Sequence, residues 1–317
     1  IMTVSDRIKG AMYGMALGDA LGLGTEFMTH REVKSYYPQG LTDFSQFIRD
    51  MHRSLYTPGE WTNDTEIILR MLEPIVKDGG KIDIKKVCLS LLEWYHEDPD
   101  DLATPYRMVF NAEGWADNPI VVCHKAWRSH HLAEASNEAL LRSLIIGLLA
   151  DKETPLTELT RRLVEITHDD SRCLATTTIA SLYIKSLIYD GHEPSYDDII
   201  EIANQIDSRV VPFIKMAKDG NFDDFHIDDE ETLWYTRKTL GIVLWTIWHC
   251  NSPEEILLRL VNAGGDADTN AALGMMIAGV KYGYDALPPI KEKLRNSERL
   301  EKIVKPLIEI VEKRIKD

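Results

Sequence analysis

The sequence is poor in cysteine, and it has far fewer basic than acidic residues. Its four cysteines, Cys88, Cys123, Cys173 and Cys250, are far apart and form no Cys-x-x-Cys pair, so neither a disulfide framework nor a zinc knuckle is indicated. Lysine and arginine number 36 against 51 aspartates and glutamates, for a formal net charge of -15. Binding to a phosphate backbone rests on clustered Lys and Arg, so we expect no nucleic-acid partner. Cations and compact ligands are expected instead.

Long apolar runs are missing as well. No stretch of about 18 apolar residues is present to span a bilayer. The first residues also lack the basic flank, apolar core and cleavage site of a signal peptide. We therefore expect no membrane partner and a cytoplasmic location, where separated cysteines stay reduced.

The spacing of apolar residues predicts an all-α fold, because alternating strand patterns are scarce. Helix starts are indicated near Thr157 and at Ser252. No low-complexity linker and no repeat of about 20 to 50 residues is visible, so residues 1–317 are predicted to form one domain. The apolar positions at helical spacing are Ile67, Ile68, Met71 and Leu72; Leu140, Leu141, Leu144, Ile145 and Leu148; and Ile256, Leu257, Leu260 and Val261.

Four glycines, at positions 10, 14, 18 and 22, recur at every fourth residue of the opening segment and share one face of a helix. Each costs helix stability, which is tolerable where another backbone must approach closely. We therefore expect tight helix packing along this face. Asp19 and the short apolar length exclude the membrane version of this spacing.

The strongest local signal is the segment 264–272, GGDADTNAA. Gly264 and Gly265 let the backbone fold tightly, and Asp266, Asp268 and Thr269 follow at the start of an expected helix. Carboxylate and hydroxyl oxygens are the ligands that magnesium and calcium prefer. The segment predicts either a divalent-cation site or, as the alternative, a helix start whose amides are capped by Asp268 or Thr269.

A calcium-binding EF-hand is a further alternative for this segment. Asp266, Asp268 and Asn270 match the first, third and fifth positions of its loop. The sixth position, however, is Ala271 where the loop needs glycine, and the twelfth is Ile277 where it needs glutamate. The EF-hand interpretation therefore fails.

A second helix is predicted to begin in segment 61–66, WTNDTE. Asn63 as N-cap, with Glu66 three residues later, satisfies the pattern of a capping box without any metal. Pro74 is expected to break or kink this helix, which limits it to roughly three turns.

A third segment, 18–26, is a glycine-rich exit from the opening helix that ends in Glu26. It lacks the Lys and Ser or Thr of a phosphate-binding P-loop, and no strand precedes it as a dinucleotide fingerprint requires. By itself, Glu26 is explained by a surface charge.

Among ten histidines none forms a His-Glu-x-x-His zinc helix, and no Gly-x-Ser-x-Gly elbow is present. His168 is the one histidine singled out as a candidate, although a polar loop between helices explains it equally well. His130 and His131 are expected to be a solvated pair.

Together these segments resemble the ADP-ribosylglycohydrolase family, which includes dinitrogenase reductase-activating glycohydrolases and vertebrate ADP-ribosylhydrolases. The likeness runs from about Asp6 to Leu287, and its last motif matches almost residue for residue. In sequence order, the matching segments are 6–10 with 18–22 (opening helix), 61–65 (first metal motif), 137–142 (central Asn-Gly-Ser-Leu-Met-Arg segment), 167–168 (Thr-His-Pro turn) and 264–272 (second metal motif).

This resemblance implies an orthogonal multi-helix domain that hydrolyses the glycosidic bond between ADP-ribose and a modified protein side chain or small acceptor, releasing ADP-ribose. It also implies two magnesium ions, with manganese as the other option. Two alternatives remain open: hydrolysis of another ADP-ribose derivative, and a catalytically silent ADP-ribose-binding protein. The implied residues are Glu26 and Asp64 for catalysis; Ser136, Asn137, His168, Gly264 and Gly265 for substrate; and Thr62, Asn63, Asp64, Asp266, Asp268 and Thr269 for metal. Asp100 or Asp101 is a further candidate to reach the substrate.

The sequence departs from the family pattern at two points. Asn63 stands where active relatives usually carry aspartate, and one lost negative charge should weaken metal affinity. Glu138 stands in a segment that usually lines the phosphate and ribose of the ligand. Its charge would repel a pyrophosphate unless the side chain points outward.

Overall fold

The computed structural model describes residues 2–130 and 135–317, which form helices joined by turns and loops. These residues contain no strand, and their one isolated antiparallel bridge joins Ser136 to Tyr235. The all-α prediction is confirmed. In the same ranges, no helix is long and apolar enough to cross a membrane. His130 is exposed, whereas His131 lies outside the described residues.

The α-helices are α1 (Val4–Gly22), α2 (His30–Tyr36), α3 (Asn63–Lys77), α4 (Ile84–Tyr95), α5 (Thr104–Phe110), α6 (Pro119–Ser129), α7 (Ser143–Leu149), α8 (Leu156–Val164), α9 (Ser171–Lys185), α10 (Tyr196–Ile206), α11 (Val211–Asp219), α12 (Thr236–His249), α13 (Pro253–Val261), α14 (Ala267–Tyr282) and α15 (Ser297–Lys316). Short 3-10 helices are Leu23–Thr25, Phe44–Gln46, Arg53–Leu55, η4 (Glu138–Arg142), Ser208–Val210, Phe222–Phe225, Tyr284–Ala286 and Pro289–Lys293, and a short π-helix covers Ser186–Asp190.

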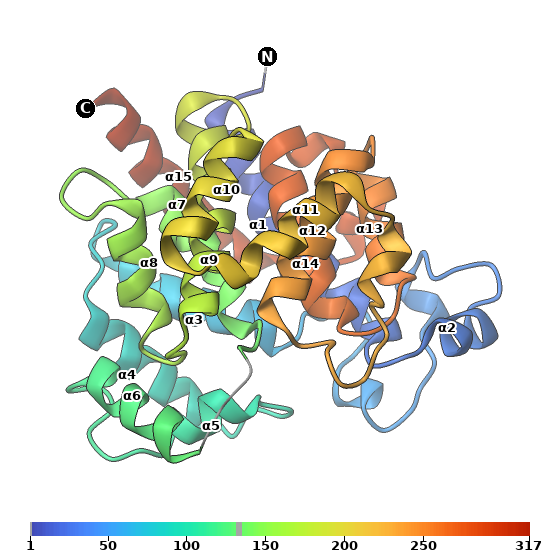
Figure 1. The fold of residues 1–317 in the computed structure, drawn as a ribbon, viewed down its shortest axis with the longest axis horizontal. Coiled ribbons are helices and arrows are strands. Elements are labelled where there is room, and N and C mark those ends of the chain that lie inside the picture. Colours follow the sequence, from blue (N-terminus) through green and yellow to red (C-terminus); the bar gives the residue numbers. More distant parts are fainter. Residues whose placement is uncertain (1, 131–134) are drawn as a thin grey trace.

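Helices α1 and α14 form the centre of the molecule, with the other helices around them (Figure 1). They run antiparallel, because a Cβ atom at Gly10, Gly14 or Gly18 would overlap the carbonyl group of residue 279, 275 or 271 respectively. At Gly22 an added Cβ would meet the backbone of residues 267 and 268. The predicted tight packing of the glycine face is therefore confirmed, and the partner is another backbone.

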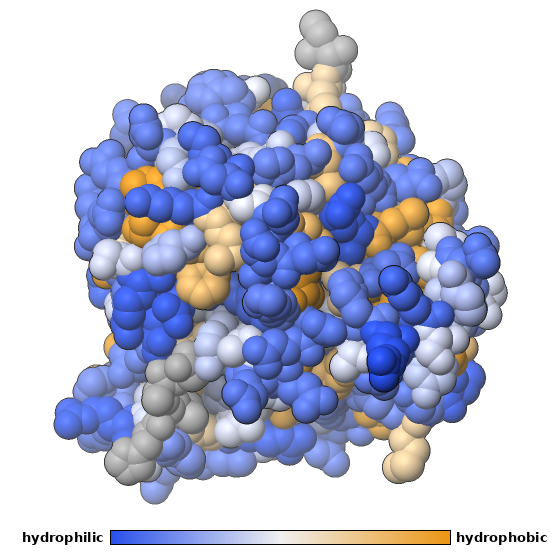
Figure 2. Space-filling view, turned by 45° about the vertical axis from the view of Figure 1, so that its right-hand side comes forward, coloured by the Kyte–Doolittle hydropathy of each residue, from blue (hydrophilic) through white to orange (hydrophobic). Residues whose placement is uncertain are grey.

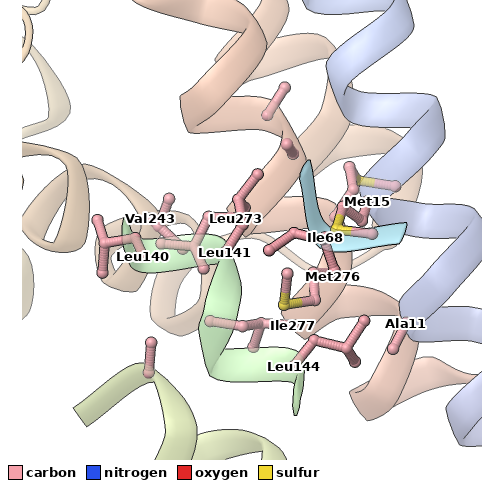
Figure 3. Close-up of a cluster of buried hydrophobic side chains, with 14 of the residues drawn as sticks. Ala11, Met15, Ile68, Leu140, Leu141, Leu144, Val243, Leu273, Met276 and Ile277 are labelled. Atoms are coloured by element: carbon pink, nitrogen blue, oxygen red, sulfur yellow. The ribbon is translucent and has the colours of Figure 1, made fainter. Parts of the chain in front are cut away.

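The core is apolar where α1, α3, α7, α12 and α14 meet. Figure 3 shows Met15, Ile68, Leu144, Val243 and Met276 converging there from these five helices. All the apolar positions that predicted helices are buried. In contrast, the face shown in Figure 2 is mostly hydrophilic, with apolar side chains in small separate patches.

Helix α3 continues through Pro74, contrary to the predicted break. Proline leaves the carbonyl of Arg70 without its usual helical donor, and the Ser90 hydroxyl donates to that carbonyl at 2.6 Å. A tertiary contact thus replaces the lost bond. Ser252 caps α13 as predicted, whereas α8 begins at Leu156, one residue before the expected cap Thr157.

Candidate active site and metal centre

A cavity of about 400 Å³ opens beside the N-terminal ends of α3 and α14. Free amides give both helix ends a partial positive charge, which favours anionic groups there. Of the residues that the family resemblance implies, all but His168, Gly264 and Gly265 line this cavity. Of the two further candidates, Asp101 lines it and Asp100 does not. The lining residues are Glu26, Phe27, Thr62, Asn63, Asp64, Asp101, Leu102, Ala103, Thr104, Pro105, Trp127, Ser136, Asn137, Glu138, Trp234, Asp266, Asp268 and Thr269.

The second metal motif forms the start of α14. Asp266 is the N-cap residue, but its side chain makes no capping hydrogen bond. Instead, its Oδ2 accepts a hydrogen bond of 2.6 Å from Nδ2 of Asn137. Thr269 donates its hydroxyl to Oδ2 of Asp64 at 2.7 Å, which joins the two predicted metal motifs. These side chains are therefore turned toward the cavity and do not serve as helix caps.

The first metal motif forms the start of α3, and its cap differs from the prediction. Thr62 caps the helix by accepting from the amide of Asp64 at 3.2 Å, whereas Asn63 is the first helical residue. The amide group of Asn63 donates to the carbonyl of Asp100. Glu66 pairs with Arg299 and makes no capping box. The capping-box interpretation was wrong, because these side chains have partners far away in the sequence.

Asp19 holds the first metal motif in place through hydrogen bonds, a role that was not predicted. Its carboxylate is fully buried and accepts from the hydroxyl and amide of Thr62 at 2.7 and 2.9 Å, and from those of Thr65 at 2.7 and 3.2 Å. Burial raises the pKa of Asp19 to about 6, although these hydrogen bonds act in the opposite direction. The available signal in the sequence was an aspartate in an otherwise apolar, glycine-rich helix, where a buried charge needs hydrogen-bond partners.

Glu26 is buried at the cavity wall, so the surface-charge alternative does not hold. Its carboxylate contacts Nε2 of His52, and Nδ1 of the same ring lies 3.7 Å from Asp101. Arg53 donates to the backbone carbonyl of Glu26. His52 lies in an irregular loop, and no sequence pattern connected it to Glu26.

Two groups of three carboxylates converge here and share Asp268. One consists of Asp19, Asp64 and Asp268, the other of Glu26, Asp266 and Asp268, and in each group one oxygen per residue lies within 4.8 Å of the others. Like charges so close together repel strongly in a poorly solvated site. Both groups are therefore candidate cation sites.

The pKa values of these carboxyl groups reflect their burial close to one another. Burial raises the pKa of Asp64 and of Asp268 well above the ordinary range, and that of Asp266 to about 7. Burial also acts to raise the pKa of Glu26, but hydrogen bonds with Asp268 and His52 outweigh it and lower that pKa. Without a cation, protons on the aspartates reduce the repulsion while Glu26 stays ionised.

The donor set fits a hard divalent cation. Oδ1 of Asp268 is buried and has no hydrogen-bond partner among residues 2–130 and 135–317. Carboxylate and hydroxyl oxygens are the preferred ligands of magnesium and manganese. A bound cation would take the place of the protons and satisfy the orphan oxygen.

The segment 135–137 is held at the cavity by its pairing with the start of α12. Ser136 bridges to Tyr235, and the amide of Thr236 donates to the carbonyl of Ala135 at 2.8 Å. Asn137, almost fully buried, donates to Asp266 and also to the hydroxyl of Thr239 at 3.0 Å. Asn137 therefore fixes the orientation of one candidate metal ligand.

His168 is fully buried behind Glu138 and does not line the cavity. Burial lowers the pKa of His168, so the ring is neutral. The hydroxyl of Thr167 accepts from Arg142 at 2.6 Å and lies 2.7 Å from Nδ1 of His168. Nε2 lies 3.3 Å from Oε2 of Glu138, and an ionised carboxylate can only accept, so Nε2 carries the proton of the neutral ring and Nδ1 accepts from Thr167.

Glu138 lines the cavity, so its side chain does not point outward, away from the expected ligand site. Burial, the largest single influence, acts to raise the pKa of Glu138, but several lowering interactions, led by the hydrogen bond with His168, together outweigh burial and lower the pKa. An ionised carboxylate thus faces the cavity in the central segment.

Gly264 and Gly265 shape the loop before α14. Both have positive φ, +73° and +63°, and a Cβ at either would overlap the carbonyl of Met28 or Ile227. The amide of Gly265 donates to Met28 at 2.9 Å, and its carbonyl accepts from Phe27 at 2.7 Å. The two glycines therefore hold the segment around Glu26 against the start of α14.

Aromatic side chains complete the cavity, and none of them was among the predicted site residues. Trp127 is buried and donates Nε1 to the carbonyl of Thr167 at 2.7 Å. Phe27 and Trp234, by contrast, are partly exposed. Phe27 has a φ of +66°, which costs a bulky residue about 1–3 kcal/mol. Strain of this kind is concentrated at functional sites.

Comparison with known proteins identifies the family of this chain. The ADP-ribosylglycohydrolase family model matches residues 2–316. ADP-ribosylarginine hydrolase Tri1 of Serratia proteamaculans is 25% identical over 315 residues, covering 95% of this chain and 79% of that protein. ADP-ribosyl-dinitrogen reductase glycohydrolase of Rhodospirillum rubrum is 26% identical over 307 residues, covering 90% and 89%. A solved structure described as an ADP-ribosylglycohydrolase-related protein complex aligns with a TM-score of 0.75 and 25% identity, covering 98% of this chain and 99% of its own. The chain therefore belongs to the ADP-ribosylglycohydrolase family.

Proposed function

We propose that this ADP-ribosylglycohydrolase requires divalent cations to hydrolyse the bond between ADP-ribose and its acceptor, with release of free ADP-ribose. The observation that carries the proposal is the pair of carboxylate groups that share Asp268, of which every member but the buried Asp19 lines one cavity. Without cations this arrangement costs stability, because its buried charges repel one another. A cost of this kind is expected of a site shaped for catalysis.

Two magnesium ions, or manganese in their place, would be held by Thr62, Asn63, Asp64, Asp266, Asp268 and Thr269. Bound cations would orient hydroxyl groups, polarise oxygen and lower the pKa of water. Asn63 would offer a cation only its carbonyl oxygen, because its amide nitrogen is a donor. That nitrogen donates to the carbonyl of Asp100.

Glu26 is the proposed acid–base residue. Its lowered pKa keeps it ionised, so it can accept a proton from an attacking water beside an oxocarbenium-like carbon. Asp64, which accepts from Thr269 across the cavity, is the second catalytic candidate. Ser136 and Asn137 would contact the ligand directly, whereas His168, Gly264 and Gly265 would act by positioning their neighbours.

The acceptor is proposed to be an ADP-ribosylated protein or a small ADP-ribose conjugate. The names of the relatives from Serratia and Rhodospirillum make arginine adducts on proteins the first class to test. A silent ADP-ribose-binding protein is the second candidate, favoured by the neutral Asn63 in the first metal motif.

The test is release of ADP-ribose from arginine-linked, serine-linked and O-acetyl substrates, with magnesium, manganese or chelator. Asp266→Ala is compared with Asp223→Ala, an exposed aspartate that does not line the cavity. We expect metal-dependent release that Asp266→Ala abolishes and Asp223→Ala retains. Release undiminished in chelator would overturn the metal proposal, and tight ADP-ribose binding without release would favour the silent receptor.

A further inference from the structure

The candidate catalytic cavity offers no basic side chain to an anion. None of the described residues that line it is a lysine, arginine or histidine. Six of the lining residues are carboxylates: Glu26, Asp64, Asp101, Glu138, Asp266 and Asp268. Two divalent cations would offset four of these six charges, so the ionised lining stays net negative. A pyrophosphate group is therefore repelled by the walls of this cavity.

A second cavity, of about 650 Å³, adjoins the first between α5 and α6, which pack against each other (Figure 1). We call it the α5–α6 pocket. Thr104 lines both cavities, so the two meet at the start of α5. The residues of this pocket that matter below are Thr104, Arg107, Met108, Asn111, Val122 and Lys125.

The charge of the α5–α6 pocket is opposite to that of the catalytic cavity. Arg107, Lys125 and His130 line it, against a single carboxylate, that of Glu113. The whole chain has a formal net charge of -15, so three basic side chains in one hollow are a local exception. A concave surface of this charge attracts anions.

The arginine and the lysine of this pocket are available to a ligand. Nε of Arg107 donates at 3.0 Å to the carbonyl of Leu102, a residue of the catalytic cavity. This bond holds the guanidinium near the junction of the two cavities, and both Nη atoms have no hydrogen-bond partner among residues 2–130 and 135–317. Within the same ranges, Lys125 makes no ion pair and no hydrogen bond.

The α5–α6 pocket also has a surface suited to a base. Met108 is buried and Val122 half-buried, and both present apolar atoms to the pocket. Tyr95 donates to Oδ1 of Asn111 at 2.9 Å, which leaves Nδ2 of Asn111 as a donor for a ligand. An apolar lining with a few polar groups is typical of small-molecule sites.

We infer that the α5–α6 pocket binds the ADP part of the substrate, with Arg107 and Lys125 on the pyrophosphate, and that the distal ribose reaches the catalytic cavity past Thr104. The inference rests on the proposed function. A guanidinium binds phosphate oxygens in pairs, and an ammonium adds a point charge. This placement differs from the one that the family resemblance implies, in which the central segment lines the phosphate. Glu138 then no longer opposes substrate binding, because the pyrophosphate lies outside its cavity.

The test compares wild type with the double variant Arg107→Gln/Lys125→Gln. Lys85→Gln/Arg128→Gln is the matched control, because it removes the same charge from two exposed residues that line neither cavity. Four quantities are measured for each variant: the Kd of ADP-ribose at low and high salt, the Kd of manganese, steady-state release from an ADP-ribosylated peptide, and thermal unfolding.

We expect the double variant to raise the Kd of ADP-ribose about tenfold, since charge-assisted hydrogen bonds are lost. The loss should be larger at low salt than at high salt. KM should rise by a similar factor, while kcat and the Kd of manganese change less than about twofold. The control should behave as wild type in every measurement.

Glu138→Gln supplies a second test. If the pyrophosphate lay against the central segment, removing this charge would strengthen ADP-ribose binding greatly. With the pyrophosphate in the α5–α6 pocket, the Kd of ADP-ribose should change less than about threefold, and a larger gain in affinity would overturn the inference.

A Kd of ADP-ribose that changes less than twofold in the double variant, or equally in the control, would also overturn it. So would a wild type that binds no ADP-ribose. If the wild type binds ADP-ribose but releases none from the peptide, the proposed function fails while the Kd comparison still tests the pocket. Conversely, normal release with an unaltered Kd in the double variant removes the pocket and leaves the proposed function intact.

Discussion

The two ends of the α1–α14 pair differ in how well their polar groups are satisfied. At one end Gly10 packs on Gly279. There Arg7 donates to the carbonyl of Val280 at 2.6 Å, near the C-terminus of α14, where the partial negative charge of the helix end favours a cation. At the other end, Asp268 keeps a buried oxygen without a partner among the described residues. One end of the helix pair thus stabilises the folded protein, whereas the buried carboxylates at the other end lower its stability.

Along the α1–α14 pair, one end therefore provides rigid packing and the other end carries the candidate catalytic site. Close backbone packing over most of the length of α1 holds the acidic end in place. If so, substitutions at the packed end should reduce stability, whereas neutralising the acidic end should raise stability and abolish activity.

The largest expected effect is at the acidic end. Asp268→Asn should lower kcat/KM about a thousandfold, since it removes a ligand shared by both carboxylate groups. Measured in chelator at pH 8, the same variant should unfold at a higher temperature than wild type. A variant that is both inactive and less stable would contradict the argument that the acidic end lowers the stability of the metal-free protein.

At the packed end, Gly14→Ala should lower the free energy of unfolding by about 3 kcal/mol, because the new methyl group would overlap the backbone at Met275. Gly114→Ala is the matched control. Its φ is +77° but no atom lies within 4 Å of the added carbon, so only about 1 kcal/mol of backbone strain is expected. Urea denaturation with chelator present measures both, and equal losses would contradict the packing argument.

The pH dependence of metal-free stability sharpens the comparison further. Asp266 has its pKa raised to about 7 in the folded protein, so the folded state keeps a proton that the unfolded chain has lost above its ordinary pKa. Stability should therefore fall by about 2 kcal/mol between pH 5 and pH 8. Magnesium should reverse the fall at pH 8.

Asp266→Asn supplies the control for this pH effect. It cannot titrate, so its unfolding free energy should vary less with pH than that of wild type. The raised pKa of Asp19, about 6, leaves part of the slope in place. An identical slope in the variant would show that Asp266 is not its source.

The smallest expected effect is that of Asn63→Asp. An added carboxylate should tighten manganese binding roughly fivefold, equivalent to about 1 kcal/mol of attraction in a partly solvated position. The gain is limited because the substitution removes the hydrogen bond to the carbonyl of Asp100. Isothermal titration measures the change, and weaker binding would show that the amide has a separate function.

Much of the fold followed from local sequence rules. Apolar spacing gives the helical faces that are buried, and the glycine interval gives a contact surface along α1. Predictions failed where distant groups replaced local ones, as with Ser90 at Pro74 and Thr62 in place of Asn63 as the cap. A local rule cannot anticipate a donor that arrives from another helix.

The sequence by itself determined the helical class, the family and the residue types of the two metal motifs, because these depend on spacing within single segments. Only the tertiary structure decided that Thr269 meets Asp64, that Asp19 supports Thr62, and that Glu138 faces the cavity. These contacts join residues far apart in the chain, and their geometry depends on how the helices pack around α1 and α14.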